Sequence, residues 1–301
     1  MNRPNLRDPN DWLYAVCAAI IAVIILTASF VGLIYLIALA PSEGHVLDDR
    51  DNTEGSVFTI ICGIIFAVCL ALVIRDLVRH MRGCPSEELS ERFMSTSMGH
   101  TSVLFGVMMV TTLISIGMVY LFGEEVTQTF IDEMTDYENI ASMMCAGPIE
   151  EFVFRFLVIG VPMVIICAFM HRARAKDLLG GFGMSWTAFI LLFISAFLFG
   201  LAHIDGWSIM KFPDTFVSGL LFGYVYIQYG LHVTIVAHSA FDILSSLELI
   251  FGEVFGTVLM AAVIAAVAVL LVRSLFKWRE YIPKERIHEP FDGSVLEMWE
   301  R

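Results

Sequence analysis

Two adjacent glutamates, Glu150 and Glu151, lie in an otherwise apolar run, PIEEFVFRFL at 148–157, that has the composition of a membrane helix. A carboxylate at the centre of a bilayer costs about 2.5–3.5 kcal/mol even on the mildest insertion scales. A membrane helix that carries two of them, with Arg155 close by, therefore has a reason to keep them. These residues are the first candidates for chemistry.

Helical spacing divides the roles of these three residues. Residues four apart lie on one face of a helix, whereas neighbours point about 100° apart. Glu151 and Arg155 are therefore expected to pair, which offsets the cost of burial and holds Glu151 ionised. Glu150 points elsewhere and remains available to another partner. This spacing predicts a reactive Glu150 and a supporting Glu151–Arg155 pair.

Two further runs place histidines at the same spacing. Phe199 and His203 are four residues apart, and so are His238 and Asp242. A carboxylate and a histidine that converge on one water are the minimum equipment for general-base hydrolysis. A second histidine can stabilise the oxyanion that forms when water attacks a carbonyl. Asp242 can orient His238 through the ring N–H.

The elements that must position these residues are membrane helices. The chain has 301 residues, 57% of them hydrophobic, with a mean hydropathy of +0.76, and the apolar residues come in long runs. This pattern predicts an all-α polytopic membrane protein with an active-site cavity inside the membrane. The candidate sites fall in three of its helices, which implies one shared interior site. The predicted spans, about eight in number, are 12–40, 55–77, 101–122, 148–170, 185–203, 212–229, 231–250 and 254–276.

The distribution of charge predicts how the chain lies in the membrane. All but three of the 18 Lys and Arg residues fall in the termini and in loops on one side. The positive-inside rule places both termini in the cytoplasm, as an even number of spans requires. The opposite loops are acidic, the net charge is −13, and both argue against a nucleic-acid partner. We expect an integral protein of the cell (plasma) membrane of a microbe, with the lipid bilayer as one partner.

The rest of the sequence predicts one membrane domain over 1–301. The segment at about 277–301 is expected to form a cytoplasmic tail against the inner membrane surface. Pro148 is expected to start or kink the fourth helix, and the spacing of Gly219 and Gly223 predicts close helix packing. Histidines outside the two runs, among them His100 and His232, are expected at the surface or interface, and the six cysteines to be packing residues.

The three motifs EExxxR, FxxxH and HxxxD, in this order, resemble the CPBP membrane proteases, which include CAAX prenyl endopeptidases and abortive-infection-like proteins. The resemblance covers about 140–250 and implies a glutamate-type intramembrane endopeptidase. It implies that Glu150 and His203 activate a water, that Glu151 orders the site with Arg155, and that His238 and Asp242 form the oxyanion side. Many relatives carry asparagine at the position of Asp242. This aspartate is therefore either protonated or only positions His238, and we favour the positioning role.

Several alternatives stay open at this point. The substrate is expected to be a membrane-associated protein or peptide, of which a lipidated CAAX tail is one possibility. No cofactor is expected, although a zinc-dependent protease is a minority alternative that the lack of an HExxH motif disfavours. A catalytically silent membrane scaffold or immunity-type protein of the same fold would be a different class of function. A transporter or proton relay is a weaker candidate, because no internal repeat is visible. The oligomeric state and the side to which the site opens stay undetermined.

Overall fold

A computed structural model describes residues 9–39, 53–85, 88–122, 135–169, 175–204 and 209–281 of the chain. Every regular element in these ranges is helical, which confirms the all-α prediction. The elements are α1 (Pro9–Leu39), α2 (Thr53–Gly83), α3 (Leu89–Met94), α4 (Ser97–Phe122), α6 (Asp136–Glu151), the π-helix η1 (Phe152–Gly160), α7 (Val161–Phe169), the 3₁₀ turn η2 (Ala175–Leu179), α8 (Trp186–Ala202), the 3₁₀ turn η3 (Ile209–Lys211), α9 (Phe212–Tyr229), α10 (Leu231–Phe251) and α11 (Glu253–Tyr281).

The helices have the length and composition of a polytopic membrane protein. Each of the eight predicted segments is helical. Among the described residues, five helical stretches are long and apolar enough to cross a membrane: Trp12–Ile37, Val57–Gly83, Ser97–Val119, Tyr137–Phe169 and Val254–Arg273. Two shorter apolar helices are Trp186–Ala202 and Leu231–Leu244. Length alone thus supports five of the eight predicted spans, and the polytopic architecture is confirmed.

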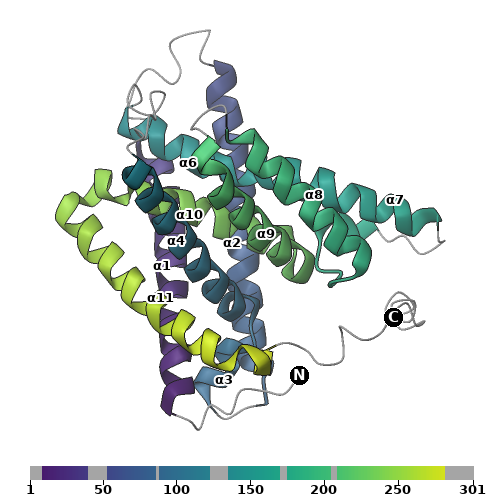
Figure 1. The fold of residues 1–301 in the computed structure, drawn as a ribbon. Helices are drawn as coiled ribbons and strands as arrows, with labels where there is room; N and C mark the ends of the chain where they lie inside the picture. Colours follow the sequence, from purple (N-terminus) through teal and green to yellow (C-terminus); the bar gives the residue numbers. More distant parts are fainter. Residues whose placement is uncertain are drawn as a thin grey trace.

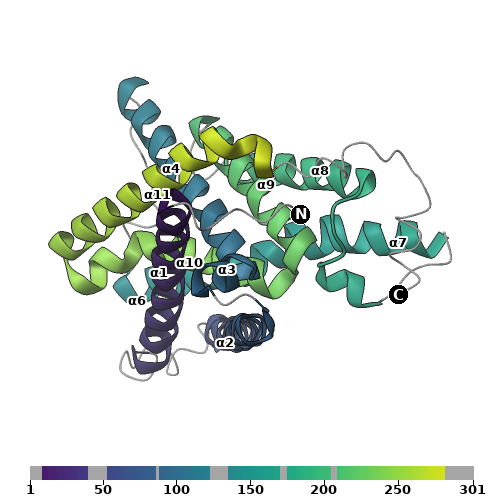
Figure 2. The ribbon, with the colours of Figure 1, turned by 90° about the horizontal axis from the view of Figure 1, so that it is seen from below.

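The helices are not all aligned with one another. Helices α1 and α2 run steeply through the molecule in Figure 1, whereas α7 and α8 are strongly inclined to them. Both views place α7 and α8 on the side of the molecule opposite α11 (Figures 1 and 2). Helix α10 packs most extensively against α6, and α8 against α9. These two pairs carry the candidate site.

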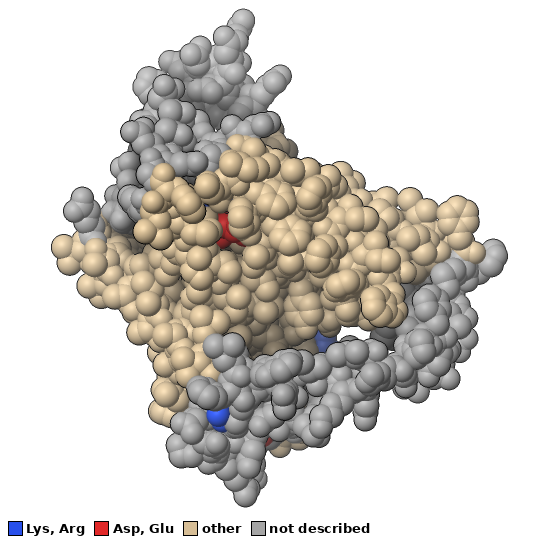
Figure 3. Space-filling view, in the orientation of Figure 1, with Lys and Arg blue, Asp and Glu red and all other residues tan. Residues whose placement is uncertain are grey.

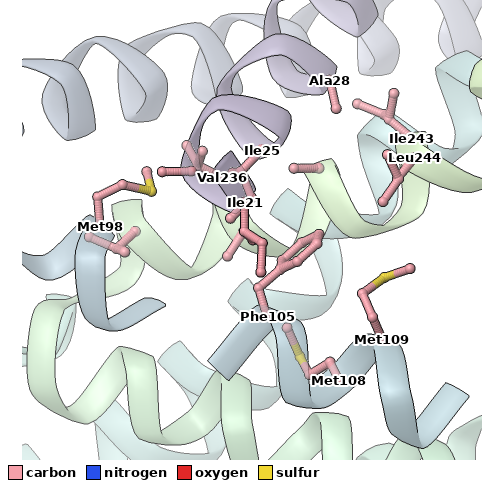
Figure 4. Packing of buried hydrophobic residues seen from close by; sticks show 14 of the residues in the cluster. Ile21, Ile25, Ala28, Met98, Phe105, Met108, Met109, Val236, Ile243 and Leu244 are labelled. Carbon is pink, nitrogen blue, oxygen red and sulfur yellow. The ribbon is translucent and has the colours of Figure 1, made fainter. Parts of the chain in front are cut away.

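Two apolar clusters hold the helices together. The larger cluster is centred on α1, α4 and α10, where Ile21 and Ile25 meet Phe105, Met108 and Val236 (Figure 4). These side chains are at most 1% exposed. The smaller cluster joins η1, α7, α8 and α9 through buried residues that include Ile159, Met163, Leu192 and Tyr226. The two clusters hold α6 and α10 on one side and α8 and α9 on the other.

The outer surface is suited to lipid. Large apolar side chains are exposed along the helices, for example Ile34, Ile64 and Ile190, which are 63%, 59% and 57% exposed. Figure 3 shows a face on which most described atoms belong to uncharged residues, with a small acidic spot near its middle and small basic spots in its lower half. Exposed apolar area on this scale is unusual for a soluble monomer. The chain is an integral membrane protein.

The structure corrects the predicted start of the fourth span. Helix α6 begins at Asp136, twelve residues before the predicted boundary, and Pro148 lies inside it. A capping box fixes this start, because the Thr135 side chain accepts from the backbone N–H of Glu138 and the Glu138 side chain accepts from the backbone N–H of Thr135. The pattern Thr-x-x-Glu is legible in the sequence as a helix start. Part of the acidic segment before the predicted span, 136–139, is therefore helical, and 123–134 lies outside the described residues.

The predictions about the C-terminal tail and about the glycines of α9 have different outcomes. Helix α11 continues to Tyr281, past the predicted start of the tail at 277, and 282–301 lies outside the described residues. The predicted close approach at Gly219 and Gly223 is confirmed. A side chain on Gly219 would meet the backbone of Ala196 at 3.0 Å, and one on Gly223 would overlap the Leu192 side chain. The absence of side chains at these two positions lets α9 pack directly on α8.

Two histidines that were expected at the surface or interface have partners inside the protein. His232 Nε2 lies 3.1 Å from Asp76 Oδ2, which joins the start of α10 to α2. The His100 ring stacks on Tyr229, with ring centroids 5.9 Å apart and an interplanar angle of 8°. The partner of His232 is 156 residues away in the sequence, so no local spacing could have indicated this contact.

Candidate active site

The two glutamates lie where the backbone changes from one helical form to another. Helix α6 ends at Glu151, and the π-helix η1 begins at the next residue. A π-helix contains an extra residue per turn relative to an α-helix, and such segments occur frequently at functional sites. The hydroxyl of Ser195 on α8 donates to the carbonyl of Phe154 at 2.7 Å. This bond fixes η1 against α8 beside the glutamates.

The predicted Glu151–Arg155 pair is present. Arg155 Nε lies 3.1 Å from Glu151 Oε2, and both side chains are fully buried. The guanidinium carbon lies 4.7 Å from the centroid of the Phe199 ring and 5.8 Å from that of Phe222. Aromatic faces attract a cation, most strongly in a dry environment. Arg155 is thus held by one carboxylate and two rings, contributed by three different helices.

Glu151 has a second partner that sequence reasoning missed. Its Oε1 atom lies 2.6 Å from Nδ1 of His238. A carboxylate that faces a guanidinium accepts hydrogen bonds, so Nδ1 carries the hydrogen. The His238 ring also stacks on Phe222, with centroids 4.4 Å apart and an interplanar angle of 18°. The orientation of His238 is therefore set by Glu151 and Phe222.

The backbone of α8 sets the tautomer of His203, which caps the C-terminus of that helix. His203 Nδ1 lies 2.8 Å from the carbonyl oxygen of Phe199. A carbonyl oxygen can only accept, so Nδ1 carries the hydrogen. In the neutral ring the lone pair is then on Nε2, the nitrogen that faces Glu150.

The reactive atoms converge on Glu150. Its Oε2 atom lies 3.7 Å from Nε2 of His203 and 3.7 Å from Nε2 of His238. Asp242 Oδ2 lies 3.5 Å from the same nitrogen of His238. The side chains of Glu150, His203 and Asp242 are 27%, 21% and 19% exposed, whereas that of His238 is 5% exposed. The structure thus brings all six predicted residues into one partly open cluster, with Glu150 at its centre.

The arrangement differs in one respect from the predicted orienting role of Asp242. The short bond to a ring nitrogen of His238 comes from Glu151, and Asp242 faces the opposite nitrogen at a longer distance. Glu151 is 87 residues from His238 in sequence, so no local spacing could have indicated the bond. The need for a second partner could nevertheless have been predicted. A buried carboxylate has two oxygens, and Arg155 contacts only one oxygen of Glu151.

The comparisons with known proteins bear on this cluster. Residues 137–244 match the family described as type II CAAX prenyl endopeptidase, Rce1-like. The stretch contains every residue of the cluster and nearly coincides with the predicted core at 140–250. Residues 137–244 form an Rce1-like CAAX protease domain. The resemblance to the CPBP membrane proteases is thereby confirmed. No curated protein and no solved structure matches the chain.

The Rce1-like domain accounts for the central helices and not for the rest of the bundle. It begins in the first turn of α6 and ends within α10, so it contains the two helix pairs α6–α10 and α8–α9. Helices α1, α2, α4 and α11 lie outside it and supply much of the larger apolar cluster. The CAAX protease family is one of hydrolases, which is the class of chemistry that the cluster of carboxylates and histidines suits.

The described residues also bear on metal binding. Among them, no group of three or more His, Cys, Asp or Glu side chains is arranged so that it could hold a metal ion. His203 and His238 each use Nδ1 for a bond to the protein and direct Nε2 toward Glu150. This geometry suits a water held between a carboxylate and an imidazole.

Proposed function

We propose that this protein is a glutamate-type intramembrane endopeptidase that hydrolyses a peptide bond of a membrane-associated substrate, of the lipidated CAAX class. The observation that carries the proposal is the convergence of His203 Nε2 and His238 Nε2 on one oxygen of Glu150, each at 3.7 Å. The Rce1-like match supports the substrate class.

Glu150 and His203 are the groups that activate water. Two atoms 3.7 Å apart can both accept from one water that lies about 2.8 Å from each. The Glu150 carboxylate and the Nε2 lone pair of His203 then each accept a hydrogen bond from this water. A lone pair of the water oxygen is left to face outward. Glu150 removes a proton as the oxygen attacks the scissile carbonyl. The protonated Glu150 afterwards gives this proton to the leaving amine.

His238 is the group that stabilises the oxyanion. Glu151 accepts from Nδ1 at 2.6 Å, which leaves Nε2 directed into the cluster. In the protonated ring, Nε2 donates to the negative oxygen of the tetrahedral intermediate. A donor fixed before the reaction stabilises the transition state without reorganisation, and removal of such a donor typically costs about 10²–10³ in kcat. Asp242 Oδ2 lies 3.5 Å from the same nitrogen and supports its protonated form.

The test is cleavage by the full chain reconstituted with a panel of farnesylated CAAX peptides and single-span peptides. Glu150→Gln and His203→Ala are each expected to abolish cleavage, with thermal unfolding unchanged. Glu91→Gln on α3 and His80→Ala on the exposed face of α2 are matched controls that should cleave as wild type does.

The outcomes separate the candidate functions. Cleavage that survives Glu150→Gln would refute the mechanism. Cleavage that a zinc chelator abolishes would move the assignment to a metalloprotease. Wild-type protein that cleaves no member of the panel would favour the catalytically silent scaffold of the same fold.

A further inference from the structure

Three exposed arginines near the end of α2, Arg75, Arg79 and Arg82, form a cationic surface outside the candidate site. They are separated by four and three residues, so they lie on one side of the helix, which we call the basic face of α2. Figure 2, which looks along α2, shows this helix at the edge of the bundle. An open hollow of about 630 Å³ borders the basic face, lined by Ile74, Arg75, Val78, Arg79, Arg82 and Gly83. The three guanidinium groups therefore border a space that a ligand can enter.

One of these arginines is held in place by a network that reaches α10. Arg75 Nε and Nη2 lie 3.1 and 2.9 Å from Asp76 Oδ1. The other carboxylate oxygen of Asp76 lies 3.1 Å from Nε2 of His232, at the start of α10. A guanidinium group has five N–H donors. Arg75 is thus oriented by Asp76 and keeps three donors for a ligand.

The basic face carries more positive charge than the protein neutralises. Within the described ranges, Asp76 is the carboxylate paired with it, and neither Arg79 nor Arg82 forms an ion pair. Three arginines against one aspartate leave two positive charges uncompensated. An anion at this face is attracted by these charges and has no protein carboxylate to displace from Arg79 or Arg82.

An apolar stripe on the same side of α2 leads away from the basic face. Its residues Ile64 and Val68 are 59% and 54% exposed and precede Arg75 by eleven and seven residues. These separations are close to three and two turns of an α-helix, so the side chains line up. From Ile64 to Arg75 the helix rises about 16 Å, close to half of the roughly 30 Å hydrocarbon core of a bilayer. A molecule with acyl chains in one leaflet and an anionic group at its surface would contact both the stripe and the basic face.

We propose that the basic face of α2 binds the phosphate of an anionic phospholipid whose acyl chains pack along the apolar stripe of Ile64 and Val68. Arginine suits this ligand because its planar fork binds phosphate oxygens through two parallel hydrogen bonds. The ligand class is a phospholipid whose headgroup carries no cation, for example phosphatidylglycerol. The site is independent of the proposed function, because none of its residues belongs to the cluster around Glu150. A ligand that binds only the folded chain stabilises it, so the lipid should also raise resistance to unfolding.

The experiment titrates the full chain in neutral detergent micelles with phosphatidylglycerol or phosphatidylcholine and measures bound lipid by native mass spectrometry. Phosphatidylcholine is the reference, because it has the same phosphate but also a choline cation. Wild type is expected to bind phosphatidylglycerol about 30-fold more tightly, which corresponds to about 2 kcal/mol for the two uncompensated arginines. Arg79→Gln/Arg82→Gln should abolish this preference. The matched control Lys176→Gln/Arg273→Gln removes the same charge from η2 and α11 and should keep the preference.

Thermal unfolding gives a second measurement on the same variants. Phosphatidylglycerol should raise the unfolding temperature of wild type and of the matched control, and leave that of Arg79→Gln/Arg82→Gln unchanged. Wild type and Arg79→Gln/Arg82→Gln should unfold alike in phosphatidylcholine alone, because these two arginines form no ion pair within the described part of the chain. Glu150→Gln should bind the lipid as wild type does, which separates this test from that of proteolysis.

Three results would overturn the proposal. The first is a preference for phosphatidylglycerol that survives Arg79→Gln/Arg82→Gln. The second is an equal loss of the preference in the matched control, which would show that only the total charge matters. The third is displacement of the lipid by inorganic phosphate at an equal concentration, which would show that the site binds a free anion and not a lipid.

Discussion

The buried pair of Glu151 and Arg155 offers a sharp energetic test. Both side chains are fully buried, and the joining atoms are 3.1 Å apart. Removal of one partner from such a pair leaves an uncompensated buried charge and costs about 3–5 kcal/mol. We therefore expect Arg155→Leu and Glu151→Leu each to lower the free energy of unfolding by this amount. If the two losses were independent, the double variant would lose about 6–10 kcal/mol.

The double variant Glu151→Leu/Arg155→Leu is expected to lose far less. It contains no unpaired charge from this pair, and replacement of a buried ion pair by apolar residues is often neutral. It still loses about 1–3 kcal/mol, because Nδ1 of His238 no longer has the Glu151 carboxylate as its acceptor. The predicted coupling between the two positions is thus at least about 3 kcal/mol.

The assay is unfolding in mixed micelles by titration with a denaturing detergent, followed by circular dichroism. All three variants should also lose activity, because each disturbs the group that orients His238. The reasoning would be refuted if the two single variants together lost as much free energy of unfolding as the double variant does, to within about 0.5 kcal/mol. Arg79→Leu on the exposed end of α2 is a control that should change stability little.

Two further predictions concern Gly147, which lies next to the cluster, and Asp242, which belongs to it. Gly147→Ala should lower the free energy of unfolding by about 1–3 kcal/mol and reduce activity, because the new methyl group would overlap the Ser239 hydroxyl on α10. The control is Gly117→Ala, where nothing lies within 4 Å of the new methyl group. It should be neutral or stabilising in the same unfolding assay. Asp242→Asn keeps a hydrogen-bonding group 3.5 Å from His238 and should retain kcat/KM within about tenfold, whereas Asp242→Ala should lose about a hundredfold. Equal activity of the asparagine and alanine variants would show that the polar group at this position is dispensable.

The parts of the site that sequence could predict are those set by spacing along one helix. The contact of Glu151 with Arg155 follows from a separation of four residues, and so does the placement of His203 beside Phe199. The bonds of His238 to Glu151 and of His232 to Asp76 join different helices. Such contacts depend on how helices pack, which no periodicity in a single sequence specifies.

The fold shows the same division between local and tertiary information. Each of the eight segments predicted from runs of apolar residues is helical, because length and composition are local properties. The prediction misplaces the start of α6 because it begins the span at residue 148, although the capping box at Thr135 marks an earlier helix start. The strong inclination of α7 and α8 to α1 was beyond prediction, because it depends on how helices from distant parts of the chain pack together.

The Glu151–Arg155 pair has a consequence for biosynthesis. Chains are made from the N-terminus at about 5–20 residues per second, so His238 emerges about 4–17 s after Glu151, 87 residues earlier. Throughout that interval α6 and η1 lack the partners that α8 and α10 provide, because those helices are synthesised later. Because Arg155 is on the same helical segment, Glu151 travels with its own counter-ion and the segment carries one net charge fewer into the lipid. The order of the residues along the chain thus lets an acidic helix partition into the membrane before its partner His238 has been synthesised.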